Sequence, residues 1–326
     1  MLFFCLGFGR QKALHSGAVP DVFAHPIDAS TRYCAVFGFP VRHSASPAMH
    51  NAGLAALGLN WRYLAFSVPP QQLKMALQGA AVMRFVGINL TVPHKLLALP
   101  MMDVLDSSAK AWGAVNTVRF EGRTGDRPWQ PLGQWSEAEE PEQVRAHGFN
   151  TDADALIRAL DEDLRWQPEG RSVLLLGAGG AGRVAALRLA ASGVRQLYLI
   201  NRTRDKAHAV AVEIQQRYPG CKVSVDYPME PVDLILNATS LGLKSTDPLP
   251  LDLERFPLHR SGAVYDMIYR PMETALLEAA RRAGRPAANG LGMLLHQGTR
   301  ALEIWTGRPA PVEVMRRALW EHVYAA

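Results

Sequence analysis

The sequence predicts an α/β protein with two domains, and three patterns along its 326 residues support this prediction. Residues 33–90 alternate between short apolar runs and helical segments, which is typical of a β-α-β-α-β unit. Residues 173–200 form a second strand–helix–strand pattern with a glycine-rich turn after the first strand. Two amphipathic segments, 294–305 and 312–324, follow as C-terminal helices.

The first unit begins with a predicted strand over 33–39, which Pro40 ends. A helix is expected to begin around 48–51, and Ser44 and Ser46 lie directly before it, with Pro47 near its first turn. On physical grounds the two hydroxyl groups are best interpreted as N-caps. Both could also donate to a carboxylate held at that helix end.

Further elements of the first unit are expected as a strand over 61–68, a helix over 70–80 and a strand over 85–90. Lys95 lies just past the end of the last strand, where open α/β sheets bind their ligands. A lone surface lysine is usually only solvated.

Residues 121–146 are rich in Gly, Pro, Trp and acids and are too long for an ordinary connection, so we expect a functional lid or a disordered insertion.

The glycine-rich turn of the second unit predicts a dinucleotide site. Gly177, Gly179 and Gly182 match the pattern G-x-G-x-x-G, with an apolar strand over 173–176 before them and a helical pattern over 184–191 after them. The first glycine permits a tight turn, the second a close approach of backbone N–H groups to a pyrophosphate, and the third close packing of helix on strand. The phosphates would lie at the positive end of the helix.

The end of the next strand, 196–200, favours NADP over NAD. An NAD site has Asp or Glu at this point, which accepts a hydrogen bond from the ribose 2′-OH. Here the strand is followed by Asn201, Arg202 and Thr203, and a guanidinium group suits a 2′-phosphate. The alternative is a solvated basic turn that binds no ligand.

Composition limits the other classes of function. The chain is 48% hydrophobic and 20% charged, which is ordinary for a globular protein. A net charge of +5 without basic runs does not indicate nucleic-acid binding. Three cysteines without a C-x-x-C pair indicate a reducing compartment such as the cytoplasm, and no apolar run is long enough to span a membrane. Residues 1–30 are poorly patterned and predict a flexible extension, with a signal peptide as the less favoured alternative.

Eight motifs occur in a fixed order over the rest of the chain. They are GFPVRHSASP at 38–47 with His50 and Asn51, GINLTVPHK at 87–95, AVNT at 114–117, NTD at 150–152, the Gly177 turn with NRT at 201–203, NATS at 237–240, YDMIY at 265–269 and GLGMLLHQ at 290–297. On these motifs the chain resembles the shikimate dehydrogenase family from Tyr33 onward.

The resemblance implies a reversible, NADP-linked reduction of 3-dehydroshikimate to shikimate in the synthesis of chorismate and the aromatic amino acids. It implies an extension over 1–30, a substrate-binding and catalytic domain over 31–152 that contains the insertion 121–146, and an NADP-binding Rossmann domain over 153–288. Helices in 289–326 would return to the first domain, and the substrate would bind between the domains. The expected partners are small molecules, without nucleic acid or membrane, and the protein is expected to be a monomer or a homodimer.

The resemblance also assigns roles to single residues. Lys95 and Asp152 would be the catalytic pair. The residues that would bind the substrate are Ser44, Ser46 and Tyr269 at its carboxylate, and Asn89, Thr91, Asn116, Asp152 and Gln297 at its ring hydroxyls. The residues that would bind NADP are Gly177, Ala178, Gly179, Gly180 and Ala181 at the phosphates, Asn201, Arg202, Thr203 and Lys206 at the 2′-phosphate, and Thr239, Met267 and Gly290 near the nicotinamide. No metal is expected.

These residue types suit the implied chemistry. Hydride addition to a ketone leaves an alkoxide, which a lysine ammonium group can stabilise and protonate. A neighbouring carboxylate keeps that lysine charged and in place. A ring with several hydroxyl groups requires short polar side chains at fixed points.

The chain departs from the family pattern at Ala155, Leu96, Leu97 and Asn289. Other readings therefore stay open: a quinate or broader cyclitol-acid dehydrogenase, a regulatory NADP-binding paralogue without turnover, or another two-domain NADP dehydrogenase that shares only the fold.

Overall fold

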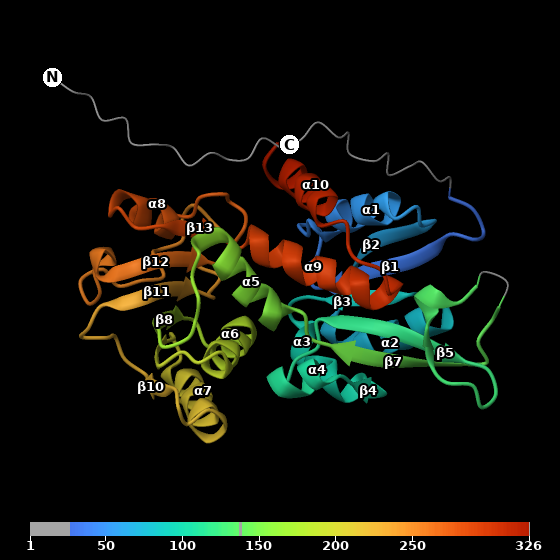
Figure 1. The fold of residues 1–326 in the computed structure, drawn as a ribbon, viewed down its shortest axis with the longest axis horizontal. Helices are drawn as coiled ribbons and strands as arrows, with labels where there is room; N and C mark the ends of the chain where they lie inside the picture. Colours follow the sequence, from blue (N-terminus) through green and yellow to red (C-terminus); the bar gives the residue numbers. More distant parts are fainter. Residues whose placement is uncertain (1–26, 137–138, 326) are drawn as a thin grey trace.

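The computed structural model describes residues 27–136 and 139–325, and it contains two β-sheets that lie side by side along the longest axis of the molecule (Figure 1). The first sheet takes its strands from residues 32–149 and the second from residues 172–289. The predicted division into two successive α/β units is therefore confirmed.

The first sheet is mixed, with the strand order β2-β1-β3-β5-β7-β4 and with β6 paired to β5. Its strands are β1 (Arg32–Gly38), β2 (Trp61–Ser67), β3 (Gly87–Leu90), β4 (Val104–Leu105), β5 (Thr117–Arg123), β6 (Gln130–Pro131) and β7 (Gln143–Phe149). Its helices are α1 (Ser46–Ala56), α2 (Leu73–Val82), α3 (His94–Leu97) and α4 (Ser107–Trp112), with short 3-10 turns η1 (Pro70–Gln72), η2 (Leu99–Met101) and η3 (Leu132–Gln134). β5 runs antiparallel to both β3 and β7, so β3 and β7 point the same way and end at the same edge of the sheet.

The insertion 121–146 contributes strands to this sheet, so the prediction of a disordered segment is wrong for the residues of those strands, while the alternative of a lid stays a prediction. In the pairing of β5 with β7, Glu121 lies opposite Arg145, and the pairing continues to Arg123 opposite Gln143. Glu121 is buried, and its carboxylate interacts with Arg119, Arg145 and His147. Alternation of polar and apolar residues did not reveal these strands, because charged residues such as Glu121 and Arg145 occupy buried and half-buried positions in them.

The second sheet is entirely parallel, with the strand order β10-β9-β8-β11-β12-β13. Its strands are β8 (Ser172–Leu176), β9 (Gln196–Ile200), β10 (Lys222–Ser224), β11 (Val232–Asn237), β12 (Ser261–Asp266) and β13 (Ala287–Asn289). Its helices are α6 (Gly180–Ala191), α7 (Arg204–Arg217) and α8 (Ala275–Arg282), with the turn η4 (Leu258–Arg260). The order reverses beside β8, which is where doubly wound sheets bind a dinucleotide.

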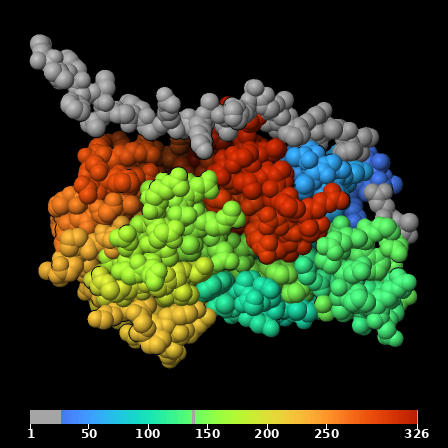
Figure 2. Space-filling view, viewed as in Figure 1, coloured from blue at the N-terminus to red at the C-terminus, as the bar shows by residue number. Residues whose placement is uncertain are grey.

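Three helices connect the two halves: α5 (Asp152–Leu164), α9 (Leu291–Thr306) and α10 (Val312–Tyr324). α9 packs on α5 and α1, and α10 packs on α1 (Figures 1 and 2). Trp305 of α9 is fully buried in the core of the first half, where its indole donates to the Val118 carbonyl oxygen at 2.9 Å. The C-terminal helices therefore return to the first sheet, as predicted.

Within the described part of the chain, no helix is long and apolar enough to cross a membrane.

Candidate active site

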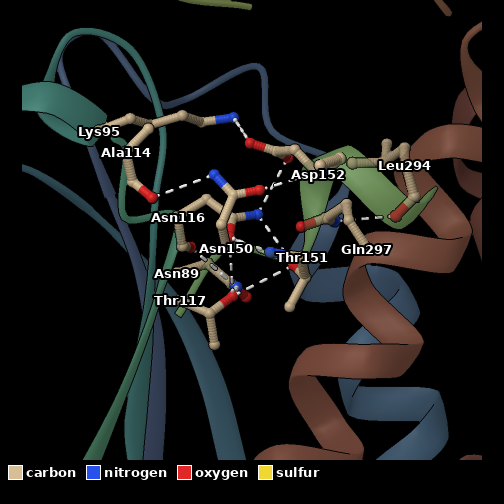
Figure 3. Close-up of polar contacts among 11 residues, drawn as sticks. Asn89, Lys95, Ala114, Asn116, Thr117, Asn150, Thr151, Asp152, Leu294 and Gln297 are labelled. Carbon is tan, nitrogen blue, oxygen red and sulfur yellow. Dashed lines mark hydrogen bonds and ion pairs between the residues drawn. The ribbon is translucent and has the colours of Figure 1, made fainter. Parts of the chain in front are cut away.

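Lys95 and Asp152 lie together at the edge of the first sheet that faces the second (Figure 3). The Lys95 ammonium is 2.7 Å from Oδ2 of Asp152. Lys95 is carried by α3, directly after β3, and Asp152 is the first residue of α5, directly after β7. The carboxylate is nearly buried, with 12% of its side chain exposed, whereas the lysine side chain is 31% exposed. The lysine can therefore meet a ligand while its partner is held inside the protein.

Asn116 fixes the other oxygen of this carboxylate. Its Nδ2 donates to Oδ1 of Asp152 at 2.9 Å and to Oγ1 of Thr151 at 2.9 Å. Its Oδ1 accepts from the backbone N–H of Thr151 at 2.7 Å. Both oxygens of Asp152 are thus bonded, one by a cation and one by an amide, and the carboxylate has a fixed orientation.

Asn89 extends this polar group along the sheet. Its Nδ2 donates to the Asn116 carbonyl oxygen at 3.3 Å and to Oγ1 of Thr117 at 3.1 Å. Asn150 anchors the start of α5, because its Nδ2 donates to the Ala114 carbonyl oxygen at 3.1 Å and its Oδ1 accepts from the Ala153 N–H at 3.2 Å. No role had been assigned to Thr117, Asn150 or Thr151, although all three belong to the motifs AVNT and NTD.

Gln297 reaches the same place from α9 (Figure 3). Its Nε2 donates to the Leu294 carbonyl oxygen at 2.8 Å, which leaves Oε1 to accept from a ligand. Thr91 lies just after β3, where its backbone N–H donates to the Phe37 carbonyl oxygen at 3.0 Å. Gln297 thus lies beside Thr151 and Asp152, although these residues are far apart in the sequence (Figure 3).

Ser44 and Ser46 lie at the start of α1, but their interpretation as N-caps is wrong. The N-cap residue is Ala45, which makes no side-chain cap, and the helix begins earlier than predicted, at Ser46. Ser44 Oγ accepts from the N–H of Ser46, the first residue of the helix, at 3.3 Å. The Tyr269 hydroxyl interacts with the Ala45 backbone, so the three residues expected at a carboxylate lie together at the N-terminus of α1.

A cavity of about 240 Å³ separates this group from the second sheet. Lys95 and Asp152 line one wall, and Gly180 and Ala181 at the start of α6 line the opposite wall. The remaining lining is largely apolar, from Val92, Pro93, Leu96, Ala114, Ala153, Leu156, Val184, Ala185, Met267 and Met293. A flat, partly aromatic ligand group could lie in it against the lysine.

The glycine-rich turn has the shape that a dinucleotide requires. Gly177 has φ +104°, a left-handed conformation that favours glycine. A Cβ at Gly182 would overlap the Gly177 carbonyl oxygen, whereas a Cβ at Gly179 or Gly180 would have no atom within 4 Å. The turn is therefore closed on its inner side and open at the N-terminus of α6, where a pyrophosphate could accept from backbone N–H groups.

Asn201, at the end of β9, ties the turn to the basic loop. Its Oδ1 accepts from the Ala178 N–H at 2.9 Å, and its Nδ2 donates to the Thr203 carbonyl oxygen at 2.7 Å. The side chains of Arg202 and Lys206 are exposed and form no ion pair with any residue that the structure describes. In contrast, the guanidinium group of Arg204 forms an ion pair with Asp226, with 3.8 Å between its nitrogen and Oδ2 of Asp226. The loop thus presents two cations that are available to a phosphate.

Of the three residues expected near the nicotinamide, Thr239 lies against the glycine turn, and Met267 and Gly290 lie against each other. The methyl group of Thr239 lies against Gly177, and Thr239 Oγ1 donates to Oδ1 of Asn237 at 2.8 Å. Gly290 lies so close to the Met267 carbonyl oxygen that a Cβ there would overlap it. Of the three, only Met267 lines the cavity.

The residues that depart from the family pattern leave this geometry intact. Ala155 is buried inside α5, while the side chains of Leu96 and Leu97 are exposed. Asn289 donates to the Met272 carbonyl oxygen at 2.8 Å and to the Tyr324 hydroxyl at 2.9 Å. Asn289 therefore holds α10 to the end of β13.

Comparison with known proteins agrees with this geometry over most of the chain. A family model described as the shikimate dehydrogenase substrate binding domain matches residues 36–118. A model described as shikimate/quinate 5-dehydrogenase matches 162–242, and a model described as the shikimate 5′-dehydrogenase C-terminal domain matches 290–319.

Individual relatives cover nearly the whole length. The shikimate dehydrogenase (NADP(+)) of Methanopyrus kandleri is 39% identical over 305 residues, which is 91% of this chain and 98% of that protein. The structure of shikimate 5-dehydrogenase from Thermus thermophilus in complex with NADP(H) and shikimate is 35% identical with a TM-score of 0.73, and the match covers 88% of this chain and 98% of that one. Quinate dehydrogenase from Corynebacterium glutamicum in complex with NAD is 27% identical with a TM-score of 0.74, over 89% and 99% of the two chains. On this sequence and structural similarity, the chain belongs to the shikimate dehydrogenase family.

Proposed function

We propose that this protein is an NADP-dependent shikimate dehydrogenase, which interconverts 3-dehydroshikimate and shikimate in the synthesis of aromatic amino-acid precursors. The observation that carries the proposal is the Lys95–Asp152 pair at 2.7 Å, which lines the same cavity as the N-terminus of α6. A proton donor and a dinucleotide-binding turn therefore face one another across a space of about 240 Å³.

Lys95 is the proton donor and acceptor of the reaction. When the ketone is reduced, the ammonium group stabilises the negative charge that develops on the carbonyl oxygen and donates a proton to it. In the reverse direction, the amine accepts the hydroxyl proton. Bound NADPH supplies the hydride, and NADP⁺ accepts it in the reverse direction.

Asp152 holds the Lys95 ammonium group in place, and Asn116 holds Asp152 in place. Since the Asp152 carboxylate is fixed at both oxygens, little reorganisation is needed when charge appears on the substrate.

The substrate carboxylate would lie at the N-terminus of α1, where Ser44 and Ser46 donate neutral hydrogen bonds and Tyr269 closes the pocket. The ring hydroxyls would bond to Asn89, Thr91, Asn116, Asp152 and Gln297. A substrate that lacks these hydroxyls would leave acceptors such as Oε1 of Gln297 without a ligand partner, which supports a specificity for polyhydroxylated rings.

The residues present suit NADP. The pyrophosphate would lie on the turn from Gly177 to Ala181, and Arg202 and Lys206 would bind the 2′-phosphate with Thr203 beside them. Asn201 supports the site indirectly, because both ends of its amide already bond to the backbone. Thr239, Met267 and Gly290 would lie near the nicotinamide. The domain limits at 152 and 288, a monomeric or homodimeric state and a cytoplasmic location stay predictions.

The test is a matrix of two cofactors against two substrates. Purified protein is given NADP⁺ or NAD⁺ with shikimate or quinate, and the absorbance of the reduced nicotinamide is followed. We expect the highest kcat/KM for NADP⁺ with shikimate. Faster turnover of quinate would make the protein a quinate dehydrogenase, and binding of NADP⁺ without turnover of either substrate would make it a non-catalytic paralogue.

A further inference from the structure

Tyr63 is bonded to the candidate substrate site although no role has been assigned to it. It belongs to β2, is fully buried, and reaches over β1 toward β3. Its hydroxyl lies 2.8 Å from Oδ1 of Asn89. Burial raises the pKa of the phenol well above its ordinary value, and the adjacent Ser46 side chain opposes this rise only in part. The phenol therefore stays protonated and donates to Asn89.

The orientation of the Asn89 amide is set from both of its ends. Nδ2 donates to the Asn116 carbonyl oxygen and to Oγ1 of Thr117, and Oδ1 accepts from Tyr63. If the amide were rotated by half a turn, its oxygen would face the Asn116 carbonyl oxygen, which cannot donate. In the observed orientation one lone pair of Oδ1 accepts from Tyr63, and the second stays available to a ligand hydroxyl.

Two neighbouring residues of α1 hold Tyr63 in place. Asn51 bonds to the Tyr63 backbone in both directions, because its Oδ1 accepts from the N–H at 2.8 Å and its Nδ2 donates to the carbonyl oxygen at 2.9 Å. The His50 ring stacks on the Tyr63 ring, with the centroids 4.2 Å apart and an angle of 2° between the planes. Burial lowers the pKa of His50 to about 3, so this stack is uncharged. α1 therefore carries both Ser46 and the residues that position Tyr63.

We propose that Tyr63 is a positioning residue for the substrate: it holds the Asn89 amide in the orientation in which Oδ1 accepts a hydrogen bond from a ring hydroxyl. The inference rests on the proposed function, because the ligand is the polyhydroxylated ring assigned there. Tyr63 itself does not touch the substrate. It connects the helix that would bind the carboxylate with the side chain that would bind the ring.

The test is the steady-state kinetics of Tyr63→Phe, which removes the hydroxyl and keeps the stacked ring. We expect the KM for shikimate to rise about fivefold to tenfold, the effect of one lost buried hydrogen bond. The KM for NADP⁺ and kcat should change by less than about twofold, since neither depends on Asn89 in this proposal. Tyr198→Phe makes the same chemical change on β9, away from the site, and should leave all three constants unchanged.

A double-mutant cycle separates positioning from loss of packing. In an Asn89→Ala background the Tyr63 hydroxyl has no amide to orient, so Tyr63→Phe should change the KM for shikimate by less than about twofold there. An equal rise in KM in both backgrounds would overturn the inference, as would a normal KM in the single variant. Wild-type turnover of shikimate is measured in the same assay. If the wild type does not turn over shikimate, the proposed function is refuted. If the wild type turns over shikimate and Tyr63→Phe has an unchanged KM for shikimate, only the role of Tyr63 is refuted.

Discussion

Lys95 and Asp152 are separated by 57 positions in the sequence, yet their side-chain atoms Nζ and Oδ2 are 2.7 Å apart. The strand directions explain this contact. β3 and β7 both run antiparallel to β5, so they end at the same edge of the sheet, and each is followed by a turn that leads into a helix. The lysine of one helix and the aspartate of the other are therefore placed side by side by the topology of the sheet.

Replacement of this lysine should remove turnover more than binding. For Lys95→Ala we expect kcat to fall by about 10²- to 10⁴-fold with a much smaller rise in the KM for shikimate, because the ammonium group acts on charge that develops in the transition state. Lys110 is an exposed lysine of α4, and the variant Lys110→Ala serves as the matched control. Near-normal kcat in Lys95→Ala would exclude this residue from proton transfer.

The preference for NADP should depend on Arg202. Arg202→Ala removes a charge-assisted hydrogen bond to the 2′-phosphate, so we expect the KM for NADP⁺ to rise by about 10- to 100-fold and the KM for NAD⁺ to change little. Arg204→Ala removes the same charge from the neighbouring side chain that faces Asp226, and its effect on NADP⁺ should be much smaller. Equal losses for both cofactors in Arg202→Ala would refute the assignment of the 2′-phosphate.

Two glycines of the same turn should respond differently to alanine. A methyl group at Gly182 would overlap the Gly177 carbonyl oxygen, so Gly182→Ala should lower the free energy of unfolding by about 1–3 kcal/mol. A methyl group at Gly180 meets no protein atom within 4 Å, so Gly180→Ala should keep its melting temperature and yet bind NADP⁺ several times more weakly. Thermal unfolding and cofactor titration of the two variants measure this difference. Unchanged NADP⁺ affinity in Gly180→Ala would place the pyrophosphate elsewhere.

Glu121 should make the stability of the protein depend on pH in the acid range. Burial acts to raise the pKa of its carboxyl group, but hydrogen bonds from His147, Arg119 and Arg145 outweigh it and lower the pKa from 4.5 to about 2. A carboxyl group whose pKa is lower in the folded state stabilises the protein above its unfolded pKa, and this contribution is lost as the pH falls from about 4.5 to about 2.

The variant Glu121→Gln tests this contribution. At neutral pH we expect it to be less stable than the wild type by on the order of 3 kcal/mol, with the difference shrinking below about pH 4.5. Urea unfolding at a series of pH values measures it, and Glu140→Gln, whose side chain is 85% exposed, is the control. A difference that does not vary with pH would show that Glu121 acts by packing alone.

Much of the second half could be predicted from the sequence, because its signals are local. The strand over 196–200 and the helix over 312–324 have the predicted limits, and the turn at Gly177 has the expected strand and helix around it. Parallel strands buried on both faces appear as plain apolar runs. A local cap also sets the start of α8, because the Thr274 hydroxyl directly before Ala275 accepts from the Leu277 N–H.

Features that depend on distant contacts could not be predicted in this way. The strands of the insertion 121–146 are stabilised by the pairing of β5 with β7 and by the buried ion pairs of Glu121, and neither produces an apolar period in the sequence. The role of Tyr63 is equally invisible, since an aromatic residue in a strand predicts only core packing. What distinguishes it is one hydrogen bond to a strand that is not its neighbour.

The last two helices affect how the chain can fold while it is being made. The core beneath α1 consists of residues such as Cys34, Met49 and Tyr63 from the start of the chain and Trp305 and Leu319 from its end. When the polypeptide has left the ribosome only as far as β13, the strands of both sheets are available, but the residues of α9 and α10 that complete this core are not. The apolar surface of the first half therefore stays exposed until α9 and α10 have been synthesised. We therefore expect that an early stop of translation just before residue 291 yields a product that aggregates or is degraded.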